Sequence, residues 1–327
     1  MPFHYSVGGI SASPDTWENA LSGSTNDFEV QPRRFFLTNT HVRELLADDI
    51  HRHVRDALSE DVRSGDATTE ATIPAESQSS ASMVTREPMV LAGMAFAIAA
   101  FKTLDPSVAC TDAVSDGTRL PGGATLLKVR GSTRALLTAE RTALNFIQRL
   151  SGVATATAAF VDTIAGTSTR ILDTRKTTPG WRTLEKYAVT CGGGWNHRHA
   201  LDDLILIKDN HLAALQDVPP NPVAAAVHRA RNRYPHLKVE VEADTLEQVS
   251  QAIAAGADIV LLDNMTHAQL VAAVRLCAGR ALTEASGGVR LETARAIAET
   301  GVDFISVGAI THSARAIDIG LDFDLPA

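Results

Sequence analysis

From residue 170 onward, short apolar runs alternate with segments in which apolar residues recur every three or four positions. The runs predict six strands, over residues 170–174, 204–208, 238–243, 258–263, 280–285 and 303–309. The other segments predict helices between the last five strands, over residues 223–234, 245–255, 266–277 and 291–300. This alternation is typical of a parallel sheet covered by helices, either an open doubly wound sheet or a β/α barrel. No G-x-G-x-x-G spacing follows the first strand, which argues against a dinucleotide-binding fold.

The pattern before residue 170 is different. Apolar positions between Val42 and Leu58 have the spacing of an amphipathic helix. Residues 80–131 read as short strands interrupted by a helix at Met94–Leu104, and a long helix is predicted over Thr133–Ser151. Strands mixed with isolated helices favour a small α+β domain. Residues 1–40 are rich in small and polar residues without sustained periodicity, so we expect a poorly ordered extension there.

Polar residues are found at the carboxyl end of nearly every predicted strand in the second half of the chain. They are Asp173 to Lys176, Lys208 to His211, Glu240 and Glu242, Asp263 and Asn264, Ser286 to Gly288, and Gly308 and Ala309. In β/α barrels the active site is built from the loops at these strand ends. Because all six strands contribute, we favour closure around one pocket over an open sheet.

The predicted fold class is therefore α/β. It combines a C-terminal β/α barrel, TIM-like but incomplete with about six parallel strands, and a smaller N-terminal α+β sandwich domain. We place the extension at residues 1–40, the N-terminal domain at residues 41–140 and the barrel at residues 141–311. The segment 312–327 is expected to pack on the N-terminal domain.

Composition narrows the range of partners. The chain has 327 residues with 30 basic and 38 acidic side chains, and its net charge of −8 argues against binding of nucleic acid or of an anionic membrane surface. The longest apolar run, residues 89–101, is shorter than the roughly 20 residues that span a bilayer. Three scattered cysteines and a first segment without secretory features predict a cytoplasmic protein.

One segment reverses the overall charge. Residues 170–200 carry a net charge of +4. Arg182 and Lys186 are four residues apart, and we interpret them as a solvated helix face. Arg175, Lys176 and Lys208 follow apolar strands directly, where guanidinium and ammonium groups can bind carboxylate or phosphate. This pattern predicts a pocket for a multiply anionic ligand.

Glycines follow the last two strands. Ser286-Gly287-Gly288 precedes a predicted helix and offers backbone N–H groups to a phosphate, and Gly308 would supply a second wall. A glycine in such a place can also simply make a tight turn. Because glycines follow both strands, we favour a phosphate site.

Carboxylates on two neighbouring strands indicate a cation. The two-residue period of a strand puts Glu240 and Glu242 on one face, and charged residues in a buried strand need partners or a metal. Asp263, at the end of the next strand, could join one of these glutamates around Mg²⁺. The alternative is a structural role in which the glutamates pair with the nearby Arg and Lys residues.

Two further patterns suggest rival chemistry. His197 and His199 have the spacing of a zinc-binding pair, but only the isolated His211 and His312 follow at later strand ends, so we disfavour a zinc hydrolase. Lys208 could instead form a Schiff base, as in barrel aldolases. A β/α-barrel lyase that uses Lys208 is the main rival on chemistry alone.

Several longer segments carry a resemblance to a known family. The most specific are LDTRKTTPGWRTLEKYAVTCGGGWNHRHALDD at 172–203, LIKDNH at 206–211 and LLDNM at 261–265. Further matching segments are EDVRSGDATT at 60–69, AERTALNFIQRLSGVAT at 139–155, VEVEADTLEQ at 239–248, EASGG at 284–288 and GVDFISVGAITHSARAIDIGLDF at 301–323. In this order they resemble quinolinate phosphoribosyltransferase, the carboxylating nicotinate-nucleotide pyrophosphorylase. Residues 1–40 have no counterpart in that family.

The resemblance implies an activity. The family transfers the phosphoribosyl group of phosphoribosyl pyrophosphate (PRPP), with Mg²⁺, to quinolinate, a pyridine dicarboxylate. The products are nicotinate mononucleotide, pyrophosphate and CO₂, in the de novo synthesis of NAD. The implied enzyme is a pentosyltransferase that works as a homodimer.

The resemblance also implies roles for individual residues. Arg175, His197 and Arg198 would grip the quinolinate carboxylates, with Lys176 and Lys208 close to substrate and pyrophosphate. Arg141 would enter the pocket of the neighbouring subunit.

The remaining implied roles concern the metal and the phosphate. Glu242 and Asp263 would hold Mg²⁺ and the ribose hydroxyls, and together with Lys176 and Lys208 they would be the catalytic residues. The 5-phosphate would be held by Ser286, Gly287, Gly288, Gly308, Ala309 and His312.

Besides the lyase, two further functions stay open. The first is that of a related phosphoribosyltransferase with a different acceptor, against which the presence of Arg141, Arg175, His197 and Arg198 argues. The second is that of a ligand-binding or regulatory module without catalytic activity.

Overall fold

Two larger sheets organise the part of the chain that the computed structural model describes, residues 45–324. All of these residues belong to one compact unit of the chain. The predicted extension at residues 1–40 and the first residues of the predicted helix at Val42 lie outside the described residues. No helix within residues 45–324 is long and apolar enough to cross a membrane.

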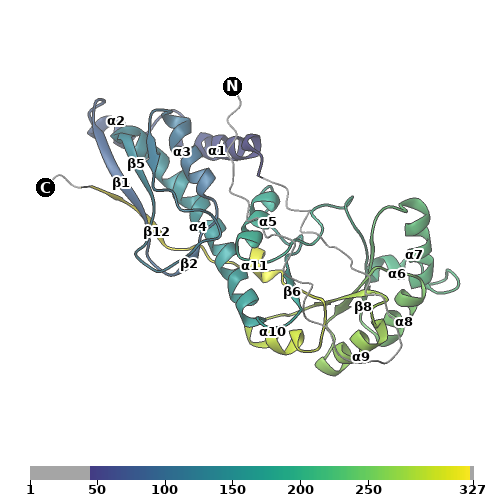
Figure 1. Ribbon diagram of the computed structural model, residues 1–327. Coiled ribbons are helices and arrows are strands. Elements are labelled where there is room, and N and C mark those ends of the chain that lie inside the picture. Colours follow the sequence, from purple (N-terminus) through teal and green to yellow (C-terminus); the bar gives the residue numbers. More distant parts are fainter. Residues whose placement is uncertain (1–44, 325–327) are drawn as a thin grey trace, which may run out of the picture. The chain divides into compact units, whose positions relative to one another are not determined.

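The smaller sheet is antiparallel and four-stranded, in the order β12-β1-β5-β3, and a separate two-stranded sheet pairs β2 with β4 (Figure 1). The four-stranded sheet forms because alternate residues of β1 are apolar. Ala81 and Met83 are buried and pair with Val129 and Leu127 of β5. The elements of this part are α1 (Ala47–Val62), α2 (Ala67–Thr72), β1 (Gln78–Thr85), β2 (Met89–Val90), α3 (Met94–Leu104), β3 (Ala109–Thr111), β4 (Arg119–Leu120), β5 (Thr125–Ser132) and α4 (Thr133–Thr163).

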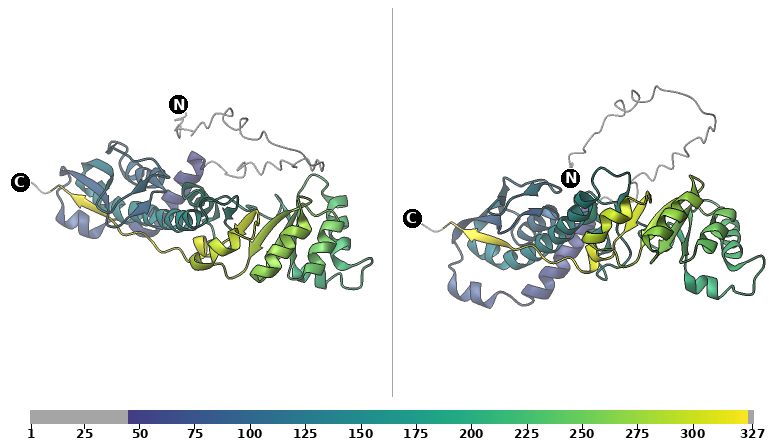
Figure 2. Two further views of the ribbon diagram at one scale, coloured as in Figure 1. Left: turned by 60° about the horizontal axis from the view of Figure 1, so that its bottom comes forward. Right: turned by 90° about the horizontal axis from the view of Figure 1, so that it is seen from below.

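The larger sheet is parallel and contains all six predicted strands, in the order β6-β11-β10-β9-β8-β7. Its elements and the last strand of the chain are β6 (Arg170–Leu172), α5 (Arg182–Cys191), β7 (Ile205–Ile207), α6 (Asp209–Ala213), α7 (Pro222–Arg233), β8 (Val239–Ala243), α8 (Leu246–Ala254), β9 (Ile259–Asp263), α9 (His267–Cys277), β10 (Leu282–Ser286), α10 (Leu291–Ala298), β11 (Phe304–Ser306), α11 (Ala309–His312) and β12 (Ile319–Phe323). Figure 2 shows α7, α8 and α9 side by side along these strands.

The strand order is that of a barrel with one open joint. From β7 to β11 each strand pairs with the next in sequence, and the first strand, β6, then pairs with the last, β11. A doubly wound sheet would reverse direction at a switch point. Within residues 45–324 no strand pairing joins β6 to β7. The predicted α/β fold class, an incomplete barrel with a smaller sandwich, is therefore confirmed.

A loop segment bridges the open joint. Trp195 forms a parallel bridge with Leu172 of β6, and its N–H donates to the carbonyl of Ile171 at 2.8 Å. Three residues later, Arg198 donates from Nη1 to the carbonyl of Leu204, directly before β7, at 3.1 Å. Residues 195–198 therefore run across the barrel between its first two strands.

Helix α4 is longer than predicted and continues to Thr163 rather than ending at Ser151. The predicted border between residues 140 and 141 lies inside this single helix, and the division into two domains stays a prediction. The chain returns to the smaller sheet at its end, where β12 pairs with β1 (Figures 1 and 2). On the way, the N–H of Ile317 donates to the carbonyl of Gln148 on α4 at 3.1 Å.

This return path requires a glycine on α4. A Cβ atom at Gly152 would lie 1.9 Å from the carbonyl oxygen of Arg315. We expect Gly152→Ala to lower the free energy of unfolding by about 2 kcal/mol, since overpacking outweighs the better helix propensity of alanine. Urea unfolding tests this, with the exposed Asn145→Ala on the same helix as a control of unchanged stability. A Gly152→Ala protein as stable as wild type would contradict the close packing of Arg315 on α4.

Candidate active site

The register of the parallel sheet places five polar side chains on one face. Glu242 of β8, Leu261 of β9 and Glu284 of β10 lie side by side, and Asp263 pairs with Ser286. Residues that pair in a sheet point to the same side, and so do residues two apart on one strand. Glu240, Glu242, Asp263, Glu284 and Ser286 therefore share one face at the carboxyl ends of their strands.

Lys208 is paired with Glu242 across this face. Its Nζ lies 2.8 Å from Glu242 Oε2, and its backbone N–H donates to Nδ1 of His211 at 2.9 Å. Glu242 therefore has a lysine partner, as the structural alternative expects of a strand glutamate, and its role toward a metal stays a prediction. The Nζ atom of Lys208 is engaged in this ion pair, which counts against its use as the Schiff-base amine of the lyase alternative.

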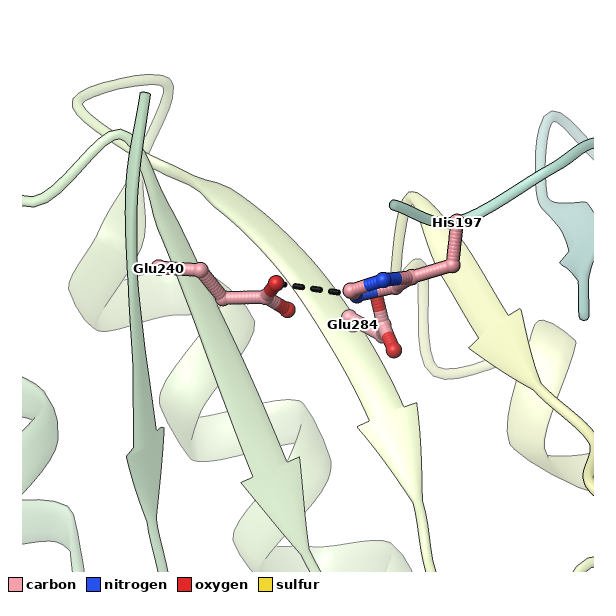
Figure 3. A group of neighbouring side chains, drawn as sticks. All are labelled: His197, Glu240 and Glu284. Carbon is pink, nitrogen blue, oxygen red and sulfur yellow. Dashed lines mark hydrogen bonds and ion pairs between the residues drawn. The ribbon is translucent and has the colours of Figure 1, made fainter. Parts of the chain in front are cut away.

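His197 reaches into the barrel and meets two buried carboxylates (Figure 3). Its Nε2 lies 2.9 Å from Glu240 Oε2 and 3.5 Å from Glu284 Oε2, and both glutamate side chains are fully buried. Burial lowers the pKa of His197, but Glu240 and Glu284 outweigh this and raise it to about 9. Burial, and then the neighbouring Glu240, raise the pKa of Glu284 to about 8. Among the described residues these three side chains are the one group of His, Cys, Asp and Glu that could together hold a metal ion.

Sequence reasoning missed Glu284. The same two-residue period that puts Glu240 and Glu242 on one face of β8 puts Leu282, Glu284 and Ser286 on one face of β10. That period could have identified Glu284 as a third inward carboxylate. Its contact with His197 depends on the register of β8 and β10, which the sequence pattern does not specify.

The sequence interpretation of Lys186 and Arg182 as a solvated helix face is wrong. Lys186 is 2% exposed, and its Nζ lies 2.5 Å from Oδ1 of the fully buried Asp173. Arg182 is half-buried and donates to the carbonyl of His199 and to Thr177. The reason is that this face of α5 packs against the loops that follow β6 and α5, so it covers protein instead of facing water.

Asp173 joins the two loops that carry the predicted anion ligands. Its carboxylate accepts hydrogen bonds from Lys186 Nζ, from Asn196 Nδ2 at 2.7 Å and from the N–H of His197 at 2.8 Å. Asp173 itself directly precedes the segment that contains Arg175 and Lys176. The loop after β6 and the loop at residues 195–198 are thus fixed to one buried carboxylate.

A second buried acid, Glu185, holds the loop after β11 through Arg149, and the sequence analysis did not identify it. Glu185 on α5 is fully buried and accepts from Arg149 of α4 at 2.7 Å and from Thr178 at 2.8 Å. Arg149 also donates to the carbonyls of Thr311, at 2.5 Å, and Ala314, at 2.6 Å. No motif in the sequence marks Arg149 or Glu185, because helix residues of this kind are usually on the surface.

Three of the predicted anion ligands lack an internal counterion. Arg175, Lys176 and Arg198 form no ion pair with a carboxylate of residues 45–324, unlike His197 and Lys208. Nε of Arg175 is buried without a hydrogen-bond partner. Burial and the proximity of Arg175 lower the pKa of Arg198. Arg175 and Arg198 are half-buried and Lys176 is exposed, so three cations without a carboxylate partner are within reach of a ligand, and this arrangement is suited to an anion.

The predicted phosphate loops lie against the same cations. A Cβ atom at Gly308 would lie 3.0 Å from Lys176 Cδ and 3.2 Å from His312 Cδ2. Thr311 Oγ1 in α11 donates to the carbonyl of Lys176 at 2.8 Å. The turn that contains Gly308, Ala309 and His312 is therefore held against the loop after β6.

The other phosphate loop requires glycine for a steric reason. Gly287 has a φ of 96°, and a Cβ atom there would lie 2.1 Å from Oδ1 of Asn264. Asn264 itself has a φ of 52° and donates to Asp263 Oδ2 at 2.7 Å. Asp263 and the loop from Ser286 to Gly288 are thus in direct packing contact.

Arg141 has no polar contact with the other predicted site residues in the described part of the chain. It is exposed on α4, and no hydrogen bond or ion pair within residues 45–324 joins it to the barrel residues. The other predicted site residues come from the strands β8, β9 and β10, from the loops after β6, β7, β10 and β11, from the loop after α5 and from α11.

The buried ion pair gives a stability prediction. Lys186→Met leaves the Asp173 carboxylate buried without its cation, and we expect the free energy of unfolding to fall by about 3 kcal/mol or more. Lys128→Met is the matched control, because it breaks an exposed ion pair with Asp112 at 2.9 Å and should change little. Urea unfolding of both variants is the measurement. Equally small losses would contradict the importance of the buried pair.

Comparison with known proteins identifies the family. The family model for the quinolinate phosphoribosyl transferase C-terminal domain matches residues 153–322, and that for the N-terminal domain matches residues 66–151. The chain is 47% identical over 275 residues to a nicotinate-nucleotide pyrophosphorylase (carboxylating) of Mycobacterium leprae, covering 82% of this chain and 95% of that protein. It is 39% identical over 292 residues to a quinolinate phosphoribosyltransferase (decarboxylating) of Nicotiana tabacum, covering 84% of this chain and 83% of that protein.

A solved structure agrees with the sequence comparisons. The nicotinate-nucleotide pyrophosphorylase from Francisella tularensis superposes with a TM-score of 0.82 at 43% identity, covering 86% of this chain and 99% of that one. Both halves of the chain, the larger sheet and the loops at its carboxyl end therefore have counterparts in one group of proteins. The chain belongs to the quinolinate phosphoribosyltransferase family.

Proposed function

We propose that the protein transfers the phosphoribosyl group of PRPP to quinolinate with decarboxylation, forming nicotinate mononucleotide, pyrophosphate and CO₂ in NAD synthesis. The observation that carries this proposal is the set of cations without counterions among residues 45–324, Arg175, Lys176 and Arg198, at the carboxyl end of the barrel. Membership in the family supports it. A dicarboxylate that enters this pocket need not displace a carboxylate of the protein.

In this proposal Arg175 and Arg198 bind the carboxylates of quinolinate, and Arg141 of a neighbouring subunit completes the pocket of a homodimer. Guanidinium groups bind carboxylates in a bidentate manner, which fixes the orientation of the pyridine ring. The exposure of Arg141 supports its use by another subunit. Lys176 and Lys208 lie close to the pyrophosphate of PRPP as point charges.

The residues proposed for Mg²⁺ fit a hard cation. Glu242 and Asp263 bring carboxylate oxygens from adjacent strands to the same face, and both are half-buried. Mg²⁺ is commonly held by one or two carboxylates together with substrate phosphates. When bound, it would neutralise charge on the pyrophosphate that leaves. The same carboxylates would hold the ribose hydroxyls, and the 5-phosphate would occupy the loops at Ser286–Gly288 and Gly308–His312.

The mechanism needs positioning and charge rather than a protein nucleophile. The bond between the anomeric carbon and the pyrophosphate oxygen breaks as Lys176 and Lys208 stabilise the charge on the leaving group. Glu242 and Asp263 stabilise the oxocarbenium-like ribose, and the pyridine nitrogen forms the new bond to the anomeric carbon. The cationic ring then accepts the electron pair released when the adjacent carboxylate leaves as CO₂, and the ring carbon takes up a proton.

We also propose that the protein works in the cytoplasm. Its three cysteines, Cys110, Cys191 and Cys277, are all free, which suits a reducing compartment.

The direct test is an assay of pyrophosphate release with PRPP, Mg²⁺ and a panel of acceptors. We expect release with quinolinate and little with nicotinate, because a second carboxylate is needed to engage both guanidinium groups. Removal of Mg²⁺ by a chelator should abolish turnover. Preference for nicotinate or for another acceptor would overturn the proposal, and quinolinate binding without release would favour a ligand-binding module.

The shared site makes a separate prediction. Arg141→Ala and Lys176→Ala should each be inactive alone, since each lacks one part of every pocket. After random exchange of equal amounts, half of the dimers are mixed and each has one pocket of two with both residues intact, so about a quarter of wild-type activity should return on mixing. The measurement is pyrophosphate release before and after mixing. Confirmed exchange without recovery would show that Arg141 acts within its own chain or outside the site.

A further inference from the structure

A closed ring of hydrogen bonds joins the loop after β6 to the loop after β11. Glu185 on α5 is fully buried, and its carboxylate accepts from Thr178 Oγ1 at 2.8 Å and from the Thr178 N–H at 3.0 Å. Arg149 of α4 donates from Nη2 to Glu185 Oε1 at 2.7 Å and to the carbonyl of Thr311 at 2.5 Å. Thr311 Oγ1 donates to the carbonyl of Lys176 at 2.8 Å. Because Lys176 is two residues before Thr178, this last contact closes the ring.

The ring connects two half-sites for phosphate, Lys176 for the pyrophosphate of PRPP and the turn Gly308–His312 for its 5-phosphate. These groups are at opposite ends of the ribose, so one PRPP molecule occupies both half-sites only when their spacing matches its length. We propose that Arg149 and Glu185 are positioning residues that set this spacing and make the site specific for a ligand with phosphates at both ends. The inference rests on the function proposed above.

Arg149 is suited to this task because its guanidinium group is fixed to a rigid element. Helix α4 has 31 residues and packs against α5 and α11 (Figure 1). Besides its bonds to Glu185 and Thr311, Arg149 donates from Nη1 to the carbonyl of Ala314 at 2.6 Å, so it holds α11 and the residues after it. A planar group with several donors fixes direction as well as distance, which an ammonium group on a flexible stem does not.

The pair acts on the ligand through other residues and not by contact. All three nitrogens of Arg149 have partners within the protein, since Nε also donates to Glu185 at 3.2 Å. The carboxylate of Glu185 is fully buried and balances the charge of Arg149. Lys176 differs, because it is exposed and forms no ion pair with a carboxylate of residues 45–324. The ring therefore fixes the backbone on which Lys176 is carried and leaves the ammonium group to the ligand.

Each half-site also has local support that does not involve the ring. The N–H of Val307 donates to the carbonyl of Leu172 at 2.9 Å, which holds the start of the loop after β11 against β6. Asp173, at the start of the loop after β6, is fixed by Lys186 Nζ at 2.5 Å. Loss of the ring should therefore alter the spacing of the half-sites more than the structure of either one. A ligand that uses a single half-site should bind almost normally, whereas PRPP should not.

The test compares the binding of PRPP, pyrophosphate and ribose 5-phosphate to Arg149→Lys, each with Mg²⁺ and without quinolinate, by titration calorimetry. Lysine keeps a positive charge near Glu185 but has one nitrogen in place of three, so it cannot hold Thr311 and Ala314 as well. We expect the Kd for PRPP to rise about tenfold and the Kd for the other two ligands to change by less than about twofold, since only PRPP spans both half-sites.

The matched control is Arg119→Lys, which alters an exposed ion pair with Asp162 of the same helix α4, at 2.7 Å, and should bind all three ligands as wild type does. Thr311→Val removes the bond to the carbonyl of Lys176 and should weaken PRPP binding selectively even if Arg149→Lys does not fold. Glu185→Gln should show the same selectivity. Arg149→Lys combined with Thr311→Val should lose less than the sum of the single losses, since both act on one spacing.

An unchanged Kd for PRPP in the folded single variants would overturn the proposal. Equal losses for all three ligands, or additive losses in the double variant, would do the same, because they indicate general damage to the loops. Wild-type protein that binds PRPP no more tightly than pyrophosphate or ribose 5-phosphate would show that the half-sites do not act together. The proposed function fails separately: wild-type protein that binds PRPP but releases no pyrophosphate with quinolinate refutes the transfer reaction, and the ligand comparison still decides the role of Arg149 and Glu185.

Discussion

The buried ion pair of Asp173 and Lys186 is the interaction on which the site depends. A charge in a protein interior is tolerated only when it is paired and fully hydrogen-bonded. Asp173 meets this condition through Lys186, Asn196 and the N–H of His197, which brings the ends of two loops to one carboxylate. The cations of both loops therefore have fixed positions before any ligand arrives, which is the condition for electrostatic stabilisation without reorganisation.

The protein separates charges that are satisfied internally from charges that are left for ligands. Lys186 and His197 are paired with buried carboxylates, whereas Arg175 and Arg198 have no such partner in the described part of the chain. An overall charge of −8 is compatible with a cationic pocket because the buried carboxylates Asp173, Glu240 and Glu284 are engaged with Lys186 and His197. Net charge thus excludes large polyanions at the surface and has no bearing on a small anionic ligand inside the barrel.

Periodicity was enough to predict most of the fold. The six strands, the four helices after β7 and the helix at Met94–Leu104 are all present, since each has an apolar period matched to its environment. Helix α4 exceeds its prediction because packing against α5, α10 and β6 sustains it beyond Gly152, a residue with low helix propensity. For the site, positions at strand ends could be predicted. The burial of Lys186 and the contact of Glu284 with His197 could not, because helical spacing does not say what covers a face and the period of a strand does not fix its register.

The course of the chain constrains the order in which the protein can be completed during synthesis. β1 is made early, but its antiparallel neighbour on one side, β12, consists of residues 319–323. Every strand of the larger sheet is translated in between. Until the ribosome has released nearly the whole chain, β1 presents an unpaired edge, which is a template for pairing with other chains. The smaller sheet can therefore reach its final form only after the barrel sequence has emerged, so a chain truncated before β12 exposes this edge even when its barrel strands are all present.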